Sequence, residues 1–117
     1  MLLLDFSDTV IVATGEGLGQ GDDALRRRVI VTYFATLIEL GMRPQAVAFY
    51  TAGVKLVADD SPCLDELRTL SALGVRLIAC RTCLDHYGLI DRVEVGEVGN
   101  MATIVELQAH AAKVVTI

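Results

Sequence analysis

Two cysteines separated by two residues are the clearest chemical feature of the sequence, in the segment Cys80-Arg81-Thr82-Cys83. The thiolate is the reactive form of cysteine, and a helix N-terminus favours it because free backbone N–H groups stabilise the anion. The apolar run at residues 75–79 predicts a strand, so Cys80 falls at its end and Cys83 in the first turn that follows. Ligands of open parallel sheets gather at the carboxyl ends of strands. The spacing therefore predicts a reactive thiol site, with Cys80 as the main candidate.

The same pair admits other interpretations. Free cysteines are often buried as small apolar residues. A structural zinc site needs four ligands, and the nearby additions are only Asp85 and His86, so we expect no metal and no cofactor. A thioredoxin-like disulfide reductase would fit the spacing, although the chain has no tryptophan and lacks a Trp-Cys-Gly-Pro-Cys type of active site. Packing and reductase alternatives stay open beside the reactive-thiol hypothesis.

Other polar residues are weaker candidates. Lys55 would stabilise a thiolate if its loop folds toward the pair, and His86, three residues after Cys83 on the same helical face, would serve as an acid or base. Asn100 is typical of a helix cap. The third cysteine, Cys63, is expected to serve in packing.

Composition narrows the class of protein. The 117 residues fit one domain over residues 1–117, and they are 53% hydrophobic but only 5% aromatic. Such a surplus of aliphatic residues suits strands covered on both faces, and leaves apolar surface for a partner subunit. The net charge of −5 argues against nucleic-acid binding. No run of apolar residues is long enough to cross a membrane, and residues 1–5 do not resemble a signal peptide. Three cysteines cannot all pair within one chain. We therefore expect a cytoplasmic protein with reduced thiols.

Strand and helix patterns alternate along the chain. The β-branched and apolar runs predict strands at residues 8–14, 45–50, 75–79, 93–95 and 113–117. Helices are predicted at residues 22–40, 51–57, 61–73, 84–89 and 100–110, with Ser61 capping the third and Pro62 at its first position. Short connections between strands and helices predict a mainly parallel sheet with helices on both faces. The glycines at 15, 17, 19 and 21 lack the spacing of a nucleotide-binding loop, and we expect a mobile loop that covers the cysteines.

Four segments, in order, resemble the DsrE/DsrF-like family, and most closely the C-terminal domain of YedF-type selenium-metabolism proteins. They are Gly19-Gln20-Gly21-Asp22-Asp23, Phe49-Tyr50-Thr51-Ala52-Gly53-Val54-Lys55-Leu56, the run from Gly74 to Leu89 around the cysteines, and Val95-Gly96-Glu97-Val98-Gly99-Asn100-Met101. Two positions depart from the pattern: Arg81 stands where the family usually has glycine, and Thr51 where it usually has asparagine. Arg81 and Thr82, between the two cysteines, are included as supporting site residues.

The resemblance implies a three-layer α/β/α sandwich with a five-stranded parallel sheet, assembled as a dimer, trimer or hexamer. It also implies a cysteine persulfide, because relatives in sulfur-relay systems carry one on the residue that matches Cys80. Our leading hypothesis is a sulfur or selenium carrier that exchanges its cargo with a TusA-like or other sulfur-relay protein. The chemistry requires an accessible Cys80 thiolate. The alternative is a non-catalytic oligomeric binding or assembly module.

Overall fold

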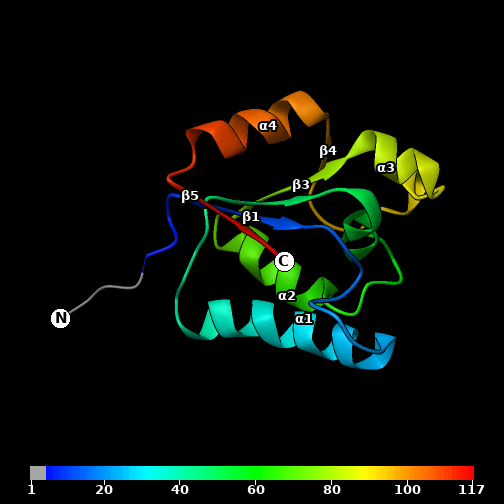
Figure 1. Ribbon diagram of the computed structural model, residues 1–117, viewed down its shortest axis with the longest axis horizontal. Helices are drawn as coiled ribbons and strands as arrows, with labels where there is room; N and C mark the ends of the chain where they lie inside the picture. The colour runs from blue at the N-terminus through cyan, green and yellow to red at the C-terminus, as the bar shows by residue number, and fades with distance from the viewer. Residues whose placement is uncertain (1–4) are drawn as a thin grey trace.

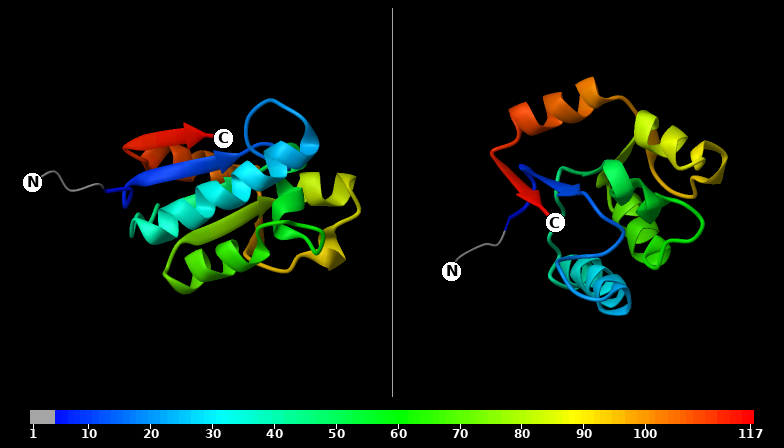
Figure 2. Two further views of the ribbon diagram at one scale, coloured as in Figure 1. Left: turned by 90° about the horizontal axis from the view of Figure 1, so that it is seen from below. Right: turned by 45° about the vertical axis from the view of Figure 1, so that its right-hand side comes forward.

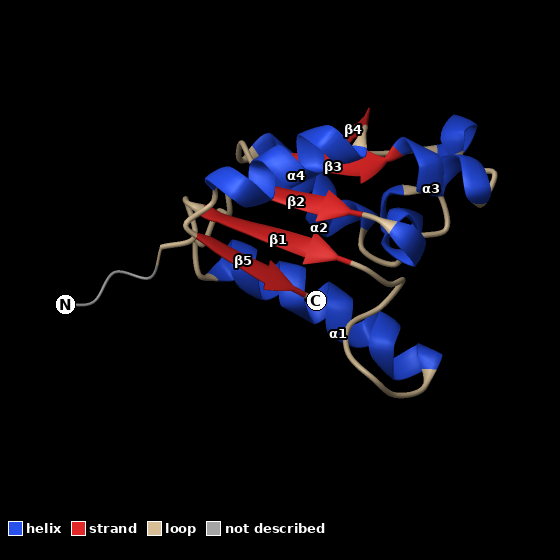
Figure 3. Ribbon diagram, turned by 45° about the horizontal axis from the view of Figure 1, so that its top comes forward, coloured by secondary structure: helices blue, strands red, loops and turns tan. Residues whose placement is uncertain are grey.

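A five-stranded, all-parallel sheet forms the centre of the protein, whose computed structural model describes residues 5–117. The order of the strands is β4-β3-β2-β1-β5 (Figure 3). Their bounds are β1 (Thr9–Ala13), β2 (Ala46–Phe49), β3 (Arg76–Cys80), β4 (Glu97–Gly99) and β5 (Lys113–Thr116). In the register of the sheet, Ile11 of β1 aligns with Val47 on one side and with Val115 on the other. The strands β1 and β2 are buried along their whole length, as their apolar runs predict.

Helices cover both faces of this sheet. On one face α1 (Asp23–Glu39) and α2 (Leu64–Ala72) lie side by side, and α4 (Met101–His110) lies on the other (Figures 1 and 2). At the carboxyl edge of the strands are the 3-10 helix η1 (Thr51–Val57), the short helix α3 (Arg81–His86) and the 3-10 turn η2 (Ile90–Arg92). The predicted three-layer α/β/α sandwich with five parallel strands is confirmed. Within residues 5–117, no helix has the length and apolar character needed to cross a membrane.

The core forms one large cluster and one small one. The large cluster contains the fully buried Phe34 of α1 and Phe49 of β2, and it extends to the opposite face of the sheet through Ile104 of α4. Withdrawing side chains of this size from water stabilises the fold by roughly 1.5–3 kcal/mol each. On the face of α4, Val10 and Val12 pack with Leu107 in a much smaller cluster. Two apolar side chains of α4 remain exposed, Met101 and Val105, and the neighbouring edge strand adds Val114.

The strand predicted at residues 93–95 is wrong, and its place in the sheet is taken by β4. Val93 instead forms an antiparallel bridge with Ala58, and the Glu94 N–H donates to the Val57 carbonyl at 2.8 Å. Gly96, at φ 82°, then turns the chain so that the next three residues pair with β3. The segment at 93–95 thus pairs with the chain that follows η1.

Two helix starts also differ from the prediction. The helix expected from residue 61 begins at Leu64, because Ser61 Oγ accepts the Cys63 N–H at 3.1 Å in a local turn and does not cap the helix. The helix expected from residue 84 begins at Arg81, directly after β3. Cys83 therefore lies inside α3.

Candidate functional site

The two cysteines lie at the carboxyl edge of the sheet, at the junction of β3 and α3. Cys80 is the last residue of β3 and pairs in register with Gly99 of the edge strand β4. Cys83 follows within the first turn of α3, and both thiols are free, as is that of Cys63. The parallel sheet thus delivers the pair to the edge where ligands of such sheets gather.

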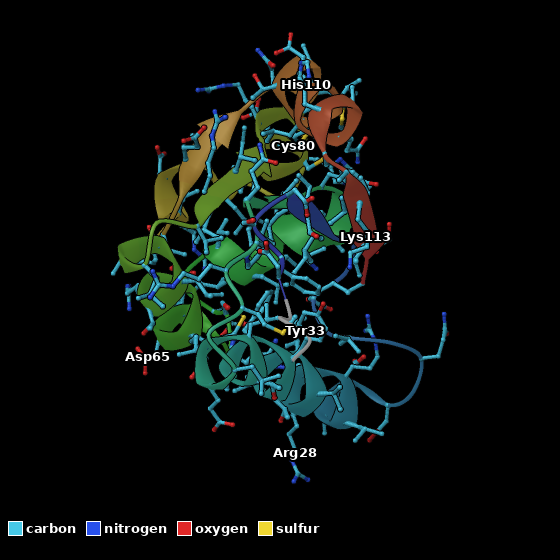
Figure 4. All side chains as sticks on the ribbon, turned by 90° about the vertical axis from the view of Figure 1, so that its left-hand side faces the viewer. Arg28, Tyr33, Asp65, Cys80, His110 and Lys113 are labelled. Carbon is cyan, nitrogen blue, oxygen red and sulfur yellow. The ribbon has the colours of Figure 1, made fainter. Side chains whose placement is uncertain are left out.

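The two thiols differ in exposure, and Cys80 is the less exposed of the two. Cys80 is only 3% exposed and belongs to the main core cluster, whereas Cys83 is half-buried (Figure 4 shows Cys80 inside the fold). The expectation that the Cys80 sulfur is accessible in the single chain is therefore wrong. Its neighbour Cys83 is the thiol that an incoming molecule meets first.

A backbone donor that sequence analysis missed contacts the more exposed sulfur. The N–H of Thr51, the first residue of η1, donates to Cys83 Sγ at 3.1 Å. Thr51 adopts φ 50°, a left-handed conformation that is unusual for a β-branched residue and that asparagine tolerates better. The sequence signal for this conformation was the asparagine that the resembling motif usually has where this chain has Thr51. The donor expected from the helix N-terminus is instead supplied by a different segment, and α3 has only six residues.

The position of Thr51 is fixed by its contacts with the end of β1. Its hydroxyl donates to the Thr14 carbonyl at 3.1 Å and lies 2.7 Å from the carbonyl of Tyr50. Two residues later, Gly53 approaches the Ala13 carbonyl so closely that an added Cβ would lie 2.0 Å from its oxygen. Only glycine fits there, so the start of η1 rests directly on β1.

Opposing influences act on the pKa of Cys83. Burial raises this pKa, the hydrogen bond with the Cys80 thiol raises it further, and negative charge on Cys80 adds to the effect; the Thr51 N–H lowers it. The contact with Cys80 thus opposes ionisation of Cys83, and the Thr51 N–H favours it. The arrangement allows one thiol to act as nucleophile while the other supplies a proton.

The supporting residues predicted from the sequence do not gather around the sulfurs. Arg81 and Thr82 are exposed on the first turn of α3. Lys55 pairs with Glu16 at 3.4 Å, and its Nζ lies 4.5 Å over the ring of Tyr87. The expectation that Lys55 folds toward Cys80 is thus replaced by a contact one turn farther along α3.

The other predicted residues have local roles. His86 is exposed and packs edge-to-face on the ring of Tyr87, with 5.0 Å between ring centroids. Asn100 is the cap of α4, as predicted, and its Oδ1 accepts the N–H of Thr103 at 2.9 Å. Cys63 is fully buried, as expected of a packing residue. Across residues 5–117, no three His, Cys, Asp or Glu side chains lie together in a way that could hold a metal ion.

The glycine-rich loop folds onto α1 and η1, away from its expected position over the cysteines. The Leu18 N–H donates to the carbonyl of Arg26, and the Arg26 Nε donates to the carbonyl of Gly19 at 2.9 Å. An added Cβ on Gly17 would meet the Arg26 backbone at 2.8 Å, so the close approach depends on glycine. The loop contacts the site through the Thr14 carbonyl, which accepts from Thr51, and through Glu16, which pairs with Lys55.

Comparison with known families decides the classification. The model of the DsrE/DsrF-like family matches residues 8–117, which is nearly the whole chain. The chain belongs to the DsrE/DsrF-like family. No curated protein matches it. Membership confirms the DsrE/DsrF-like resemblance found in the sequence and gives the chain a fold related to sulfur relay.

Solved structures of the same fold come from bacteria and an archaeon. The chain is similar to the YchN protein of E. coli, at 20% identity and a TM-score of 0.65, with 93% of this chain and 97% of that one covered. It is also similar to MTH1491 of Methanobacterium thermoautotrophicum, a protein of unknown function, at 23% identity and 0.68, with the same coverage. A third is BT1422 of Bacteroides thetaiotaomicron, also of unknown function, at 18% identity and 0.65, covering 94% and 95%. At these identities the likeness concerns the fold alone.

Proposed function

We propose that this DsrE-like protein is a sulfur carrier that holds the transferred atom as a persulfide on Cys80. The observation that carries the proposal is the contact between the two free thiols at the carboxyl edge of the sheet, where Thr51 donates to the outer one. Such a pair can share a single negative charge, which thiol exchange requires. The resemblance to YedF-type proteins leaves selenium as an alternative cargo.

The transfer itself is a thiol exchange that needs no metal. The Cys80 thiolate attacks the outer sulfur of a donor persulfide R–S–SH, the donor S–S bond breaks, and R–S⁻ leaves as the new S–S bond forms on Cys80. Because Cys80 is 3% exposed, loading requires Cys83 to move aside. Release follows when an acceptor thiol takes the outer sulfur. Alternatively, the Cys83 thiolate attacks the Cys80 sulfur, forms a disulfide and expels HS⁻.

The source and the recipient of sulfur are then separate proteins or small molecules. A TusA-like or other sulfur-relay protein is the partner that the resemblance favours. The exposed apolar side chains of α4 and β5 support a homo-oligomer, a dimer, trimer or hexamer, under this proposal.

One observation favours a second candidate function. The low exposure of Cys80 is what a packing cysteine shows, and it suits a non-catalytic oligomeric binding or assembly module. The two candidates differ in the reactivity of Cys80: a module of this kind would keep the thiol unreactive.

The deciding experiment is persulfide loading followed by intact mass measurement. We expect the wild type to gain one sulfur atom from inorganic polysulfide, and Cys80→Ser to gain none. The matched control is Cys63→Ser, which alters the buried thiol outside the pair and should load like the wild type. An unmodified wild type, or undiminished loading of Cys80→Ser, would refute the carrier proposal.

A further inference from the structure

A pocket of about 290 Å³ opens one helical turn from the thiol pair. Two of its lining residues, Lys55 and Tyr87, lie in or next to the two helices that meet at Cys83. Lys55 belongs to η1, which begins at Thr51, and Tyr87 directly follows α3, which contains Cys83. Lys55 follows Thr51 by four residues in η1, and Tyr87 follows Cys83 by four residues, donating its N–H to the Cys83 carbonyl at 3.2 Å. One turn of either helix spans about 5–8 Å. A molecule of modest size bound in the pocket therefore lies close to Cys83, the more exposed thiol.

The pocket carries equal numbers of positive and negative side chains. The positive ones are Arg27, Lys55 and Arg92, and the negative ones are Glu16, Asp59 and Asp60. They pair across the walls: Lys55 with Glu16 at 3.4 Å, and Arg92 with Asp59 through two contacts of 2.8 and 2.9 Å. A polyanion would meet three carboxylates here. A ligand that carries a positive and a negative group can interact with both the basic and the acidic side chain of each ion pair.

The apolar part of the wall comes mainly from the ring of Tyr87, which is 38% exposed. Leu56 and Leu89 also line the pocket but are buried. The volume lies near the lower end of the range for small-molecule sites. Size, mixed charge and an apolar wall together suit a small amino-acid-like or peptide-like molecule.

We propose that this pocket binds a low-molecular-weight zwitterionic thiol, of the cysteine or glutathione class, whose persulfide is the sulfur donor. The inference rests on the proposed carrier function and names its substrate class. The ammonium and carboxylate groups of the ligand are held by the paired side chains, and its sulfur points along η1 and α3 toward Cys83. The thiolate of Cys80 then takes the outer sulfur of R–S–SH, and R–S⁻ departs through the same pocket.

Binding is tested without sulfur chemistry. We would titrate S-methylglutathione into the Cys80→Ser/Cys83→Ser protein and follow backbone amide shifts by NMR. Saturable shifts are expected at Lys55 and Tyr87, with affinity about tenfold weaker after Tyr87→Ala or Lys55→Gln. The control is Arg68→Gln, which removes an ion pair with Glu94 outside the pocket and should leave affinity unchanged. Absence of saturable shifts, or an affinity in both pocket variants equal to that of the Cys80→Ser/Cys83→Ser protein, would overturn the inference.

Loading rates separate this inference from the proposed function. In a chain with both cysteines intact, Lys55→Gln should lower the ratio of the loading rate from glutathione persulfide to the loading rate from inorganic polysulfide about tenfold. If the wild type loads from neither donor, the carrier function fails. If polysulfide loads the protein but the pocket variant keeps the wild-type ratio of the two loading rates, only the pocket inference fails.

Discussion

The backbone N–H of Thr51 donates to Cys83 Sγ across 32 residues of sequence, at 3.1 Å. This bond joins the start of η1 to α3. The Thr51 hydroxyl, through the Thr14 carbonyl, adds the end of β1 to the same junction. The left-handed conformation of Thr51 aims its N–H at the sulfur, and strained residues of this kind tend to cluster at functional sites. The exposure and the charge of the outer thiol thus depend on a segment far from it in sequence.

Substitutions of Thr51 should separate its strain from its hydrogen bonds. Thr51→Val keeps the β-branch in a left-handed conformation and loses the hydroxyl contact with Thr14, so we expect a loss of about 1–2 kcal/mol in the free energy of unfolding. Thr51→Asn tolerates the conformation better and should be at least as stable as the wild type. Urea unfolding measures both. A valine variant as stable as the asparagine variant would contradict the assignment of strain.

Because Gly53 contacts β1 closely, its replacement should lower the free energy of unfolding and also change the pKa of Cys83. Gly53→Ala places a Cβ against the Ala13 carbonyl, so η1 must shift, at a cost of about 2–3 kcal/mol. The shift draws the Thr51 N–H away from Cys83, so the pKa of Cys83 should rise. The rate of alkylation of Cys83, measured against pH in a Cys80→Ser background, reports this pKa.

The matched control for this variant is Gly99→Ala. Its added methyl meets the Ile78 side chain, at Cδ1 and Cγ1, and no backbone atom, so the cost should be smaller than that of Gly53→Ala and the alkylation profile unchanged. An equal loss of unfolding free energy in the two variants would contradict the claim that the contact of Gly53 with the Ala13 backbone makes this position more sensitive.

Cys63 should make the fold sensitive to alkaline pH. Burial raises its pKa from 9.0 to about 11, so the folded state keeps a proton that the unfolded state has lost. Its contribution to stability is complete below pH 9 and disappears as the pH rises to 11, at about 1.4 kcal/mol per pH unit. Cys63→Ala should reduce the fall in unfolding free energy between pH 9 and 11. Identical slopes for the variant and the wild type would disprove this assignment.

Much of the fold was predictable because its central strands are continuous apolar runs. The runs at β1, β2 and β3 can be buried only between two helical layers, and the cap of α4 at Asn100 is a local signal. The short strand β4 was not predictable. Its sequence Glu97-Val98-Gly99 has no strand pattern, and its position depends on the turn at Gly96 and on pairing with β3.

The site was predictable in position but not in its details. The end of a buried strand located the two cysteines at the carboxyl edge. Which sulfur faces solvent depends on packing of the finished core. The donor to Cys83 is Thr51, whose unusual φ is indicated only by the asparagine that the resembling motif usually has at this position. Lys55 was expected to stabilise a thiolate if its loop folded toward the cysteines. The loop does contact Cys83, through Thr51, but the Lys55 side chain pairs with Glu16 and lies over Tyr87.

Locating the transferred sulfur tests the carrier account most directly. Arg81 lies between the two cysteines, so trypsin separates them into peptides 77–81 and 82–92. The polysulfide-loaded wild type would be alkylated at once, to stop sulfur from migrating between thiols, then digested and analysed by mass spectrometry. The account predicts the extra sulfur on the peptide of Cys80, with Cys83 recovered as a simple alkylated thiol. Extra sulfur confined to the peptide of Cys83, or found on neither peptide, would contradict it.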